Sequence, residues 1–296
     1  MWCREEEPHT SEAQCGAVRR RLWSREEEPR KSQTANRKSQ IVNMITTSVN
    51  CKINLGLNII RKRQDGYHDL ETVFFPTDFY TDRLIFEPGG EELVFECRSP
   101  WDTGADCDNL CVKAFRLLQR DYGIRGGQLV LEKGIPIGAG LGGGSADAAF
   151  TLKMLTEAFS LPLDNARLKQ YAAQLGSDVP FFIDNVPMYA TGRGEILTPL
   201  ALDLSGYRLE IVKPDISVST KEAYAGITPR VPDLNVRDIV RLPVEEWTGK
   251  LRNDFEESIF QRHPELAELK AGMYRKGAAY AAMSGSGTAV FGLFPK

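Results

Sequence analysis

The residues best suited to chemistry in this sequence form a glycine-rich segment, GIPIGAGLGGGSADAAF, which runs from Gly134 to Phe150. Six of its first eleven residues are glycine, and fixing a glycine costs more backbone entropy than fixing any other residue. A cluster this dense is expected where side chains would obstruct a group that must approach the backbone. A dinucleotide site, a phosphate site and a flexible turn without a ligand could each explain it.

The dinucleotide interpretation rests on Gly138, Gly140 and Gly143, which match the pattern G-x-G-x-x-G. That fingerprint also needs a second strand that ends in an acidic residue about twenty positions later, to hold the ribose. Here the interval holds a predicted helix, the loop LPLDN and another predicted helix, with Asp164 in the position of an N-cap. The residues after the glycines therefore disfavour a dinucleotide.

A phosphate site fits the segment better than a flexible turn, because a helix is expected to begin directly after the glycines, at Ser145. Backbone N–H groups at a helix N-terminus and the helix dipole both attract an anion. Ala146, Ala148 and Ala149 keep the start of this helix uncovered, and the Ser145 hydroxyl could cap the helix or bind Mg²⁺. The sequence lacks G-x-x-x-x-G-K-[ST], so the predicted cradle is not a Walker loop.

Asp147 fits this cradle least well, because a carboxylate near the start of the helix would repel a triphosphate. It can be tolerated if it faces Mg²⁺ or takes part in capping. We predict no catalytic role for it.

A strand expected at residues 49–59 carries a second group of interest. Apolar and polar residues alternate strictly there, which predicts one apolar face and one polar face. Lys52 and Asn54 therefore point the same way, and the neighbouring strand positions offer Lys52 no acidic partner. Lys52 is either a solvated surface lysine or a group that serves chemistry.

Asp178 lies in the segment AQLGSDVPFF, after a predicted helix end at Gly176 and before an apolar run. Taken alone, this pattern favours a turn aspartate over a catalytic one. Tyr67 and His68 follow a predicted turn, and a lone histidine is also more often structural than functional. These residues become candidates only in the light of the rest of the sequence.

The elements that must position these groups mix strands with helices. The first half predicts a turn at 65–66 with a strand after it, a hairpin about 88–90, a helix at 108–123 and another at 164–176. The second half starts near Pro199 and predicts helices near 254–261 and 264–276, then two short strands about a glycine-serine turn in AAYAAMSGSGTAVFGLF. There is no regular βαβ repeat, so the predicted class is α+β.

Composition excludes several classes of protein. The 296 residues carry a net charge of −3, with no basic stretch outside the first 43 residues, which argues against a nucleic-acid partner. No apolar run is long enough for a membrane span, and no secretory signal is visible. The six cysteines contain no C-x-x-C pair, so we predict reduced thiols in a cytoplasmic protein.

Residues 1–43 differ from the rest, with REEEP twice, the run RRR and almost no apolar periodicity. Such a segment cannot bury enough apolar surface to offset its ordering entropy, so we expect a disordered extension. Met44 would be a more natural start, and we favour an extension without a role over a regulatory tail.

The segment PIGAGLGGGSADAA resembles the central motif of the GHMP kinases, which are named for galactose, homoserine, mevalonate and phosphomevalonate. KINLGLNI near the start and the late MSGSGTAVF fit the same family. The longer segments NCKINLGLNIIRKRQDGYHDLETVF and LGSDVPFF are similar to the branch that phosphorylates a cytidine diphosphate-linked methylerythritol in the non-mevalonate isoprenoid pathway. The resemblance covers Met44 to the C-terminus.

This resemblance implies a two-domain α+β fold, with a mixed α/β N-terminal domain at 44–198 and a smaller ferredoxin-like C-terminal domain at 199–296. It implies a small-molecule kinase that transfers the γ-phosphate of ATP, with Mg²⁺, to an alcohol, the 2-hydroxyl of its substrate. No nucleic-acid or membrane partner is expected, and the chain would act as a monomer or homodimer.

The resemblance also assigns roles to individual residues. Lys52 and Asp178 fall on the family's catalytic lysine and aspartate, and Tyr67 and His68 on the residues that bind the cytidine, with Asn54 close enough to help. Asn109 is a candidate adenine contact, and Ser145 a candidate Mg²⁺ ligand. The ATP cradle would consist of Pro136, Ile137, Gly138, Ala139, Gly140, Leu141, Gly142, Gly143, Gly144, Ser145 and Ala146.

Other functions stay open at this point. Within the family the alternative is another GHMP kinase such as homoserine kinase, although Gly66-Tyr67-His68 suits a cytidine substrate better. Outside it, the chain could be an NAD-binding oxidoreductase or a non-catalytic nucleotide-binding module. Stabilisation by Mg-ATP, by NAD or by the cytidine compound would separate these.

Overall fold

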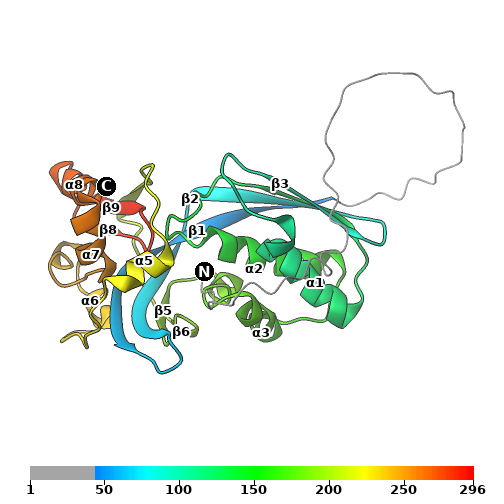
Figure 1. Cartoon of the computed structure of the whole chain (residues 1–296), viewed down its shortest axis with the longest axis horizontal. Coiled ribbons are helices and arrows are strands. Elements are labelled where there is room, and N and C mark those ends of the chain that lie inside the picture. The colour runs from blue at the N-terminus through cyan, green and yellow to red at the C-terminus, as the bar shows by residue number, and fades with distance from the viewer. Residues whose placement is uncertain (1–43) are drawn as a thin grey trace, which may run out of the picture.

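The computed structural model describes residues 44–296, and the predicted extension at residues 1–43 lies outside the described residues. Two β-sheets, each covered by helices, lie at opposite ends of an elongated molecule (Figure 1). Within residues 44–296, no helix is both long enough and apolar enough to cross a membrane.

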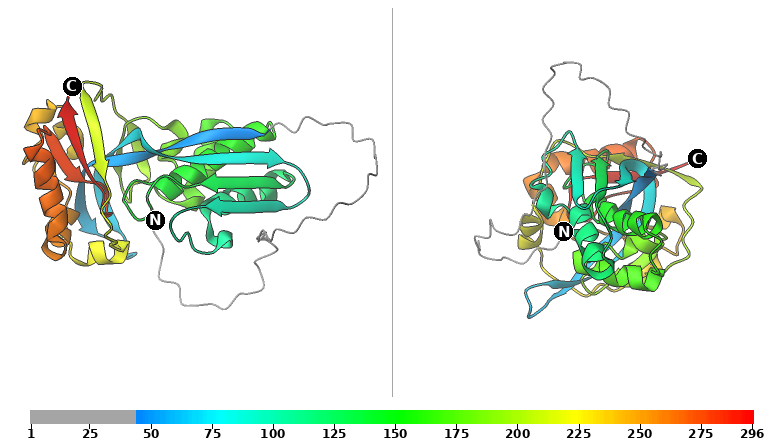
Figure 2. Two further views of the ribbon diagram at one scale, coloured as in Figure 1. Left: turned by 90° about the horizontal axis from the view of Figure 1, so that it is seen from above. Right: turned by 90° about the vertical axis from the view of Figure 1, so that its right-hand side faces the viewer.

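The larger sheet is built from the first six strands. Its main path follows the order β3-β4-β2-β5-β6, and β1 pairs with β2. The strands are β1 (Ile45–Lys62), β2 (His68–Pro88), β3 (Leu93–Arg98), β4 (Gly127–Glu132), β5 (Met188–Thr191) and β6 (Ile196–Pro199). The long β1 and β2 run from this sheet to the C-terminal half of the chain, as Figure 2 shows.

The alternation predicted for residues 49–59 lies within β1, but both of its faces are buried. The apolar side chains enter the cores, while Lys52 and Asn54 on the polar face are only 3% and 2% exposed. The prediction of a half-buried strand was therefore wrong in one respect, because packing from the glycine-rich loops covers the polar face. The predicted turn at 65–66 and the strand after it are confirmed.

The predicted hairpin about residues 88–90 was wrong. β3 does not pair with β2. It pairs in parallel with β4, which lies between the two. The reason lies in the close approach of backbones at Gly126 and Gly127. A Cβ at Gly126 would lie 2.0 Å from the carbonyl oxygen of Glu92, and one at Gly127 would lie 2.6 Å from that of Glu87.

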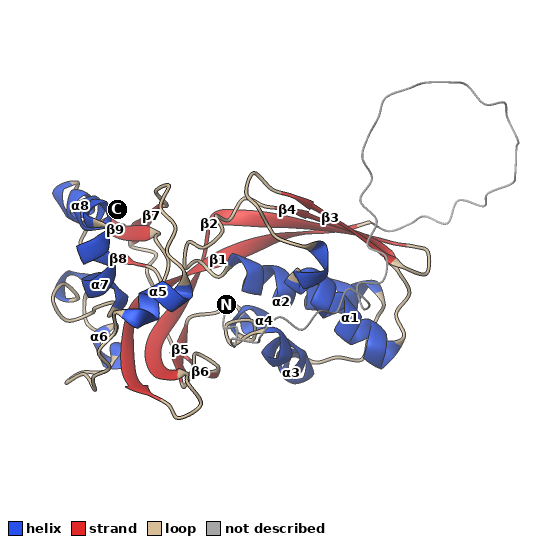
Figure 3. Ribbon diagram, in the orientation of Figure 1, coloured by secondary structure: helices blue, strands red, loops and turns tan. Residues whose placement is uncertain are grey.

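Helices cover one face of the larger sheet (Figure 3). They are α1 (Leu110–Tyr122), α2 (Gly143–Ala158), α3 (Asn165–Leu175) and α4 (Phe181–Asp184), with a short 3₁₀ turn at Asp106–Asp108. The core between sheet and helices holds large side chains such as Phe86, Phe115 and Phe181, and it anchors α2 beneath the strands. The position of α2 is therefore fixed by its packing against the sheet.

The smaller sheet has the order β7-β9-β8 and is antiparallel throughout. Its strands are β7 (Tyr207–Val212), β8 (Tyr280–Met283) and β9 (Val290–Pro295), and the predicted strand pair about a glycine-serine turn is β8 and β9. The helices of this half are α5 (Thr220–Ala225), α6 (Val236–Ile239), the 3₁₀ turn Val244–Glu246, α7 (Phe255–Arg262) and α8 (Pro264–Arg275). The two sheets use residues 45–199 and 207–295, and a domain boundary at 198 stays a prediction.

Candidate active site

The glycine-rich loop ends in α2, which begins at Gly143 rather than at Ser145 as predicted. Gly138, Gly140 and Gly142 all have positive φ, between 69° and 77°, a conformation that side chains disfavour. Within the described residues, the backbone N–H groups from Gly138 to Ser145 donate no hydrogen bond. The loop and the first turn of α2 therefore present a run of unpaired donors, as an anion site requires.

A second glycine-rich loop, at residues 284–288, holds this loop in place. A Cβ on Gly140 would lie 2.0 Å from the carbonyl oxygen of Ser284, and one on Gly287 would lie 2.1 Å from the backbone nitrogen of Gly140. The Ser284 hydroxyl donates to the Gly140 carbonyl at 3.0 Å. Several of the glycines thus serve backbone packing between the two halves of the chain as well as access for a ligand.

Gly144 offers the cleanest test of the cradle, because a Cβ there meets nothing closer than Leu110 Cδ1 at 4.0 Å. We expect Gly144→Val to leave the melting temperature within a few degrees of wild type but to raise the KM for ATP, since the branched side chain occupies the approach to the helix N-terminus. The matched control is Gly206→Val in the C-terminal half, where a Cβ also meets open space. Unchanged ATP affinity in a folded Gly144→Val protein would contradict the cradle.

Lys52 reaches from β1 to this loop. Its Nζ donates to Asn54 Oδ1 at 2.5 Å and to the Gly140 carbonyl at 2.8 Å, and it lies 5.2 Å from the ring centre of Phe74. Burial lowers the pKa of Lys52 from its usual 10.5, while the negative charge of Asp178 opposes that shift. Lys52 is thus a desolvated cation fixed beside the glycine loop.

Asp178 lies in the turn between α3 and α4 and is partly exposed. Within the described residues its carboxylate forms no hydrogen bond, and it interacts with Lys52 through space rather than in a direct ion pair. A Cβ on Gly194, in the β5–β6 turn, would lie 3.4 Å from Asp178 Oδ1. The fold therefore brings together the lysine and aspartate that the sequence separates, and it leaves the carboxylate available to a ligand.

Asn54 is engaged on both sides of its amide. Its Oδ1 accepts from Lys52, its Nδ2 donates to Thr72 Oγ1 at 3.0 Å, and its backbone N–H donates to Ser284 Oγ at 3.1 Å. These contacts orient the Lys52 amine. The predicted contact of Asn54 with substrate stays a prediction.

Tyr67 and His68 lie half-buried at the start of β2. The His68 ring lies 4.8 Å from the Tyr224 ring at 33° between planes, and the Arg193 guanidinium lies 5.0 Å above the Tyr67 ring. Burial, and after it the charge of Lys62, lowers the pKa of His68, which favours a neutral imidazole. Burial and the charge of Asp178 both raise the pKa of Tyr224, so this aromatic group lies within electrostatic reach of the carboxylate.

Sequence reasoning missed Tyr224 and Arg193. They come from α5 and from the β5–β6 turn, far from Tyr67 in sequence, and neither stands in a motif. An aromatic residue in the short segment STKEAYAGI gives no signal of its own.

The Asp147 side chain is buried, and its Oδ2 accepts from Lys133 Nζ at 2.7 Å. Of the two alternatives considered for it, capping was wrong, because the N-cap of α2 is Gly142 and no side chain caps the helix. Ser145 is the third residue of α2 and does not cap it, because the N-cap is Gly142 with no side-chain bond.

The Asn109 side chain accepts from the Cys111 N–H at 2.9 Å and so caps α1.

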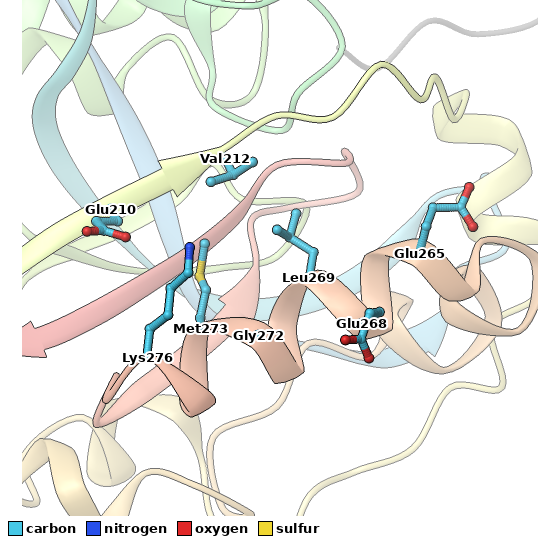
Figure 4. A pocket seen from close by; sticks show the side chains of 8 residues that line it. All are labelled: Glu210, Val212, Glu265, Glu268, Leu269, Gly272, Met273 and Lys276. Atoms are coloured by element: carbon cyan, nitrogen blue, oxygen red, sulfur yellow. The ribbon is translucent and has the colours of Figure 1, made fainter.

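A surface cavity of about 300 Å³ between β7 and α8 lies away from these groups (Figure 4). Glu210, Met273 and Lys276 are among its lining residues, and none of the candidate site residues is. It has neither glycine-rich backbone nor a converging lysine and aspartate, so the candidate active site is the region between the glycine loop, Lys52 and Asp178.

Comparison with known proteins agrees with this geometry. The family model for the GHMP kinases N terminal domain matches residues 109–188, and that for the GHMP kinases C terminal matches residues 244–296. The chain is 49% identical over 251 residues to the 4-diphosphocytidyl-2-C-methyl-D-erythritol kinase of Bacteroides fragilis, covering 84% of this chain and 91% of that protein. It is 47% identical over 248 residues to the enzyme of that name from Azobacteroides pseudotrichonymphae, covering 83% and 92%.

Solved structures give the same result. The crystal structure of a 4-(cytidine 5'-diphospho)-2C-methyl-D-erythritol kinase superposes with a TM-score of 0.71 at 36% identity, covering 84% of this chain and 90% of that one. The mevalonate kinase of Methanococcus jannaschii shares the fold, with a TM-score of 0.62 at 15% identity over 87% and 92%. The predicted two-domain α+β kinase fold is confirmed. The chain belongs to the GHMP kinase family and groups there with the 4-diphosphocytidyl-2-C-methyl-D-erythritol kinases.

Proposed function

We propose that this chain transfers the γ-phosphate of ATP to the 2-hydroxyl of 4-diphosphocytidyl-2-C-methyl-D-erythritol, in the non-mevalonate route to isoprenoid precursors. The observation that carries this proposal is the position of Lys52, buried between the glycine loop and Asp178. The substrate named for the relatives at 47–49% identity supports the choice of substrate.

Phosphoryl transfer depends on positioning and on stabilising charge more than on covalent help from the protein. We assign the triphosphate to the donors from Gly138 to Ser145. Asp178 would accept the proton that the attacking hydroxyl loses, and Lys52 would orient that hydroxyl and offset the charge that develops on the transferred phosphoryl group. The bond from the γ-phosphorus to the bridging oxygen breaks as the bond to the substrate oxygen forms, and ADP leaves.

Mg²⁺ would arrive with the nucleotide, neutralising phosphate charge, rather than occupy a site built by carboxylates. In the described part of the chain no three acidic, histidine or cysteine side chains gather around a common point. Mg²⁺ bound with the nucleotide would keep phosphate oxygens and waters as most of its ligands. Ser145 is the side chain that we assign as a protein ligand, since its hydroxyl makes no hydrogen bond to another described residue.

The cytidine would lie at Tyr67, His68 and Tyr224. Their half-buried rings supply flat surfaces for a base, and the neutral imidazole can both donate and accept a hydrogen bond. Homoserine, the substrate of the alternative kinase, has no base to bind there. A monomeric or homodimeric state and a cytoplasmic location belong to the same proposal.

A kinase assay with purified protein tests this function. We expect ADP release with Mg-ATP and the cytidine compound but not with homoserine, and no stabilisation by NAD in a thermal-shift assay. In His68→Ala, the KM for the cytidine substrate should rise by the factor that corresponds to a loss of about 1–3 kcal/mol in binding free energy, the range for a base stacked on an aromatic side chain. The KM for ATP should change little. Equal changes in the two KM values would show that His68 has a structural role. Activity with homoserine alone would refute the proposed cytidine substrate.

A further inference from the structure

Beneath the glycine loop lies a buried cluster of three charged side chains, Asp82 from β2, Lys133 after β4 and Asp147 from α2. Their side chains are only 0%, 5% and 4% exposed. The Lys133 ammonium donates to both carboxylates, to Asp147 Oδ2 at 2.7 Å and to Asp82 Oδ2. The ammonium thus lies between two buried carboxyl groups, and burial, against the attraction of Lys133, raises the pKa of Asp147 well above its usual 3.8.

The cluster joins the two ends of the glycine loop. The other oxygen of Asp82, Oδ1, accepts from the backbone N–H groups of Gly134 and Ile135 at 2.6 and 2.7 Å, where the loop begins. Asp147 is the fifth residue of α2, just past the point where the loop ends. Lys133 therefore connects the entry of the loop to the helix that follows it.

Stability alone is a weak explanation for this arrangement. Buried ion clusters are often no more stable than apolar side chains of similar volume, because desolvating the charges costs as much as their attraction returns. Asp147 Oδ1 also lacks a hydrogen-bond partner among the described residues, a costly state for a buried carboxylate. What the cluster supplies, and apolar packing would not, is directional bonds to defined points at both ends of the loop.

The ammonium also lies directly behind the predicted phosphate site, because a Cβ on Gly143 would be 3.4 Å from Lys133 Nζ. Burial disfavours the charged amine, but the attraction of Asp147 and Asp82 outweighs burial and raises the pKa of Lys133. Lys133 thus keeps its positive charge at the first turn of α2, where that charge adds to the helix dipole.

We propose that Lys133, held between Asp82 and Asp147, is a positioning residue that fixes the glycine loop and the start of α2 in the conformation that binds ATP. The inference rests on the proposed ATP cradle and adds to it the residues that set its geometry. The cluster acts through the loop backbone, so it governs affinity for ATP and not the transfer step.

The test compares three variants in the full chain. Asp147→Leu removes one anchor and should raise the KM for ATP about tenfold, the size expected for one hydrogen bond to a charged group, with kcat and the KM for the cytidine substrate nearly unchanged. Asp147→Asn keeps an acceptor for Lys133 and should recover most of that affinity. Lys133→Met/Asp147→Leu replaces both members of the ion pair with apolar side chains and leaves Asp82 on the loop N–H groups, so it covers the case in which Asp147→Leu does not fold.

The stabilisation of each folded variant by Mg-ATP, measured by thermal shift, gives a second readout that needs no turnover. It should shrink in Asp147→Leu and in the double variant but not in Lys169→Met, a control that loses a lysine ion pair on α3. If both cluster variants keep wild-type ATP affinity and only melt earlier, the cluster is purely structural and the inference fails. If ATP stabilises the wild type but the cytidine compound is not phosphorylated, the proposed function fails and this inference still stands.

Discussion

Replacing Asp178 by asparagine should lower kcat by about two to four orders of magnitude, the contribution of a general base to proton transfer. The change keeps the shape of the side chain and removes its charge. Because the carboxylate forms no hydrogen bond to another described residue, the change removes only its through-space attraction to Lys52. Folding and both KM values should therefore stay close to wild type, since the lost interaction matters chiefly in the transition state.

The matched control for this variant is Asp184→Asn, six residues along the chain. Asp184 forms an ion pair with Lys169 at 2.5 Å and is 22% exposed. Asp184 is also an aspartate and lies in the same segment, but it does not lie beside Lys52. The kcat of Asp184→Asn should therefore stay within about twofold of the wild-type value. Steady-state kinetics with both substrates would check the pair, and a near-normal kcat in Asp178→Asn would remove the catalytic assignment.

Part of the candidate site could be predicted from local pattern, while Asp178, Tyr67 and His68 became candidates only through the resemblance to the GHMP kinases. Alternation along β1 placed Lys52 and Asn54 on one face, and the glycines before α2 indicated an anion site, because each signal depends only on neighbouring residues. The start of α2 was misplaced by two residues, since glycines at 143 and 144 are poor helix formers that the packed loop nevertheless holds in helical geometry.

What could not be predicted depends on contacts between distant segments. Periodicity identifies a strand but not its partner, so the parallel pairing of β3 with β4 was missed. Asp147 fitted the phosphate helix poorly and could be tolerated only if it faced Mg²⁺ or took part in capping, and only the fold shows its ion pair with Lys133. The contact of His68 with Tyr224 likewise joins segments that no local motif connects.

The neighbourhood of Lys52 makes it possible to remove the amine without disrupting the fold. In Lys52→Met, the Gly140 carbonyl would still accept from Ser284 Oγ, and the apolar side chain would lie against Phe74. Asn54 Oδ1 would lose its donor, at a cost of about 1–3 kcal/mol in folding free energy. Kinetics should therefore be measured well below the melting temperature of the variant.

Under those conditions Lys52→Met should lower kcat by about two to four orders of magnitude, similar to Asp178→Asn, because the two groups act on one transferring phosphoryl group. The double variant should be little worse than either single one, as expected for residues that act as a unit. The control is Lys153→Met, which removes another lysine with a pKa lowered by burial and should keep kcat within about twofold. Additive losses in the double variant would show that Lys52 and Asp178 act independently.

The pH profile gives Lys52 a signature that a structural residue would lack. Burial disfavours the ammonium and lowers the pKa of Lys52 below 10.5, so the amine loses its proton at a lower pH than an exposed lysine does. If the charged form stabilises transfer, kcat of the wild type should fall on the alkaline side with an apparent pKa below 10.5. The residual activity of Lys52→Met should lack that alkaline limb, because no titrating amine remains at the site. An identical limb in the variant would assign it to another group and leave Lys52 as an anchor of the glycine loop.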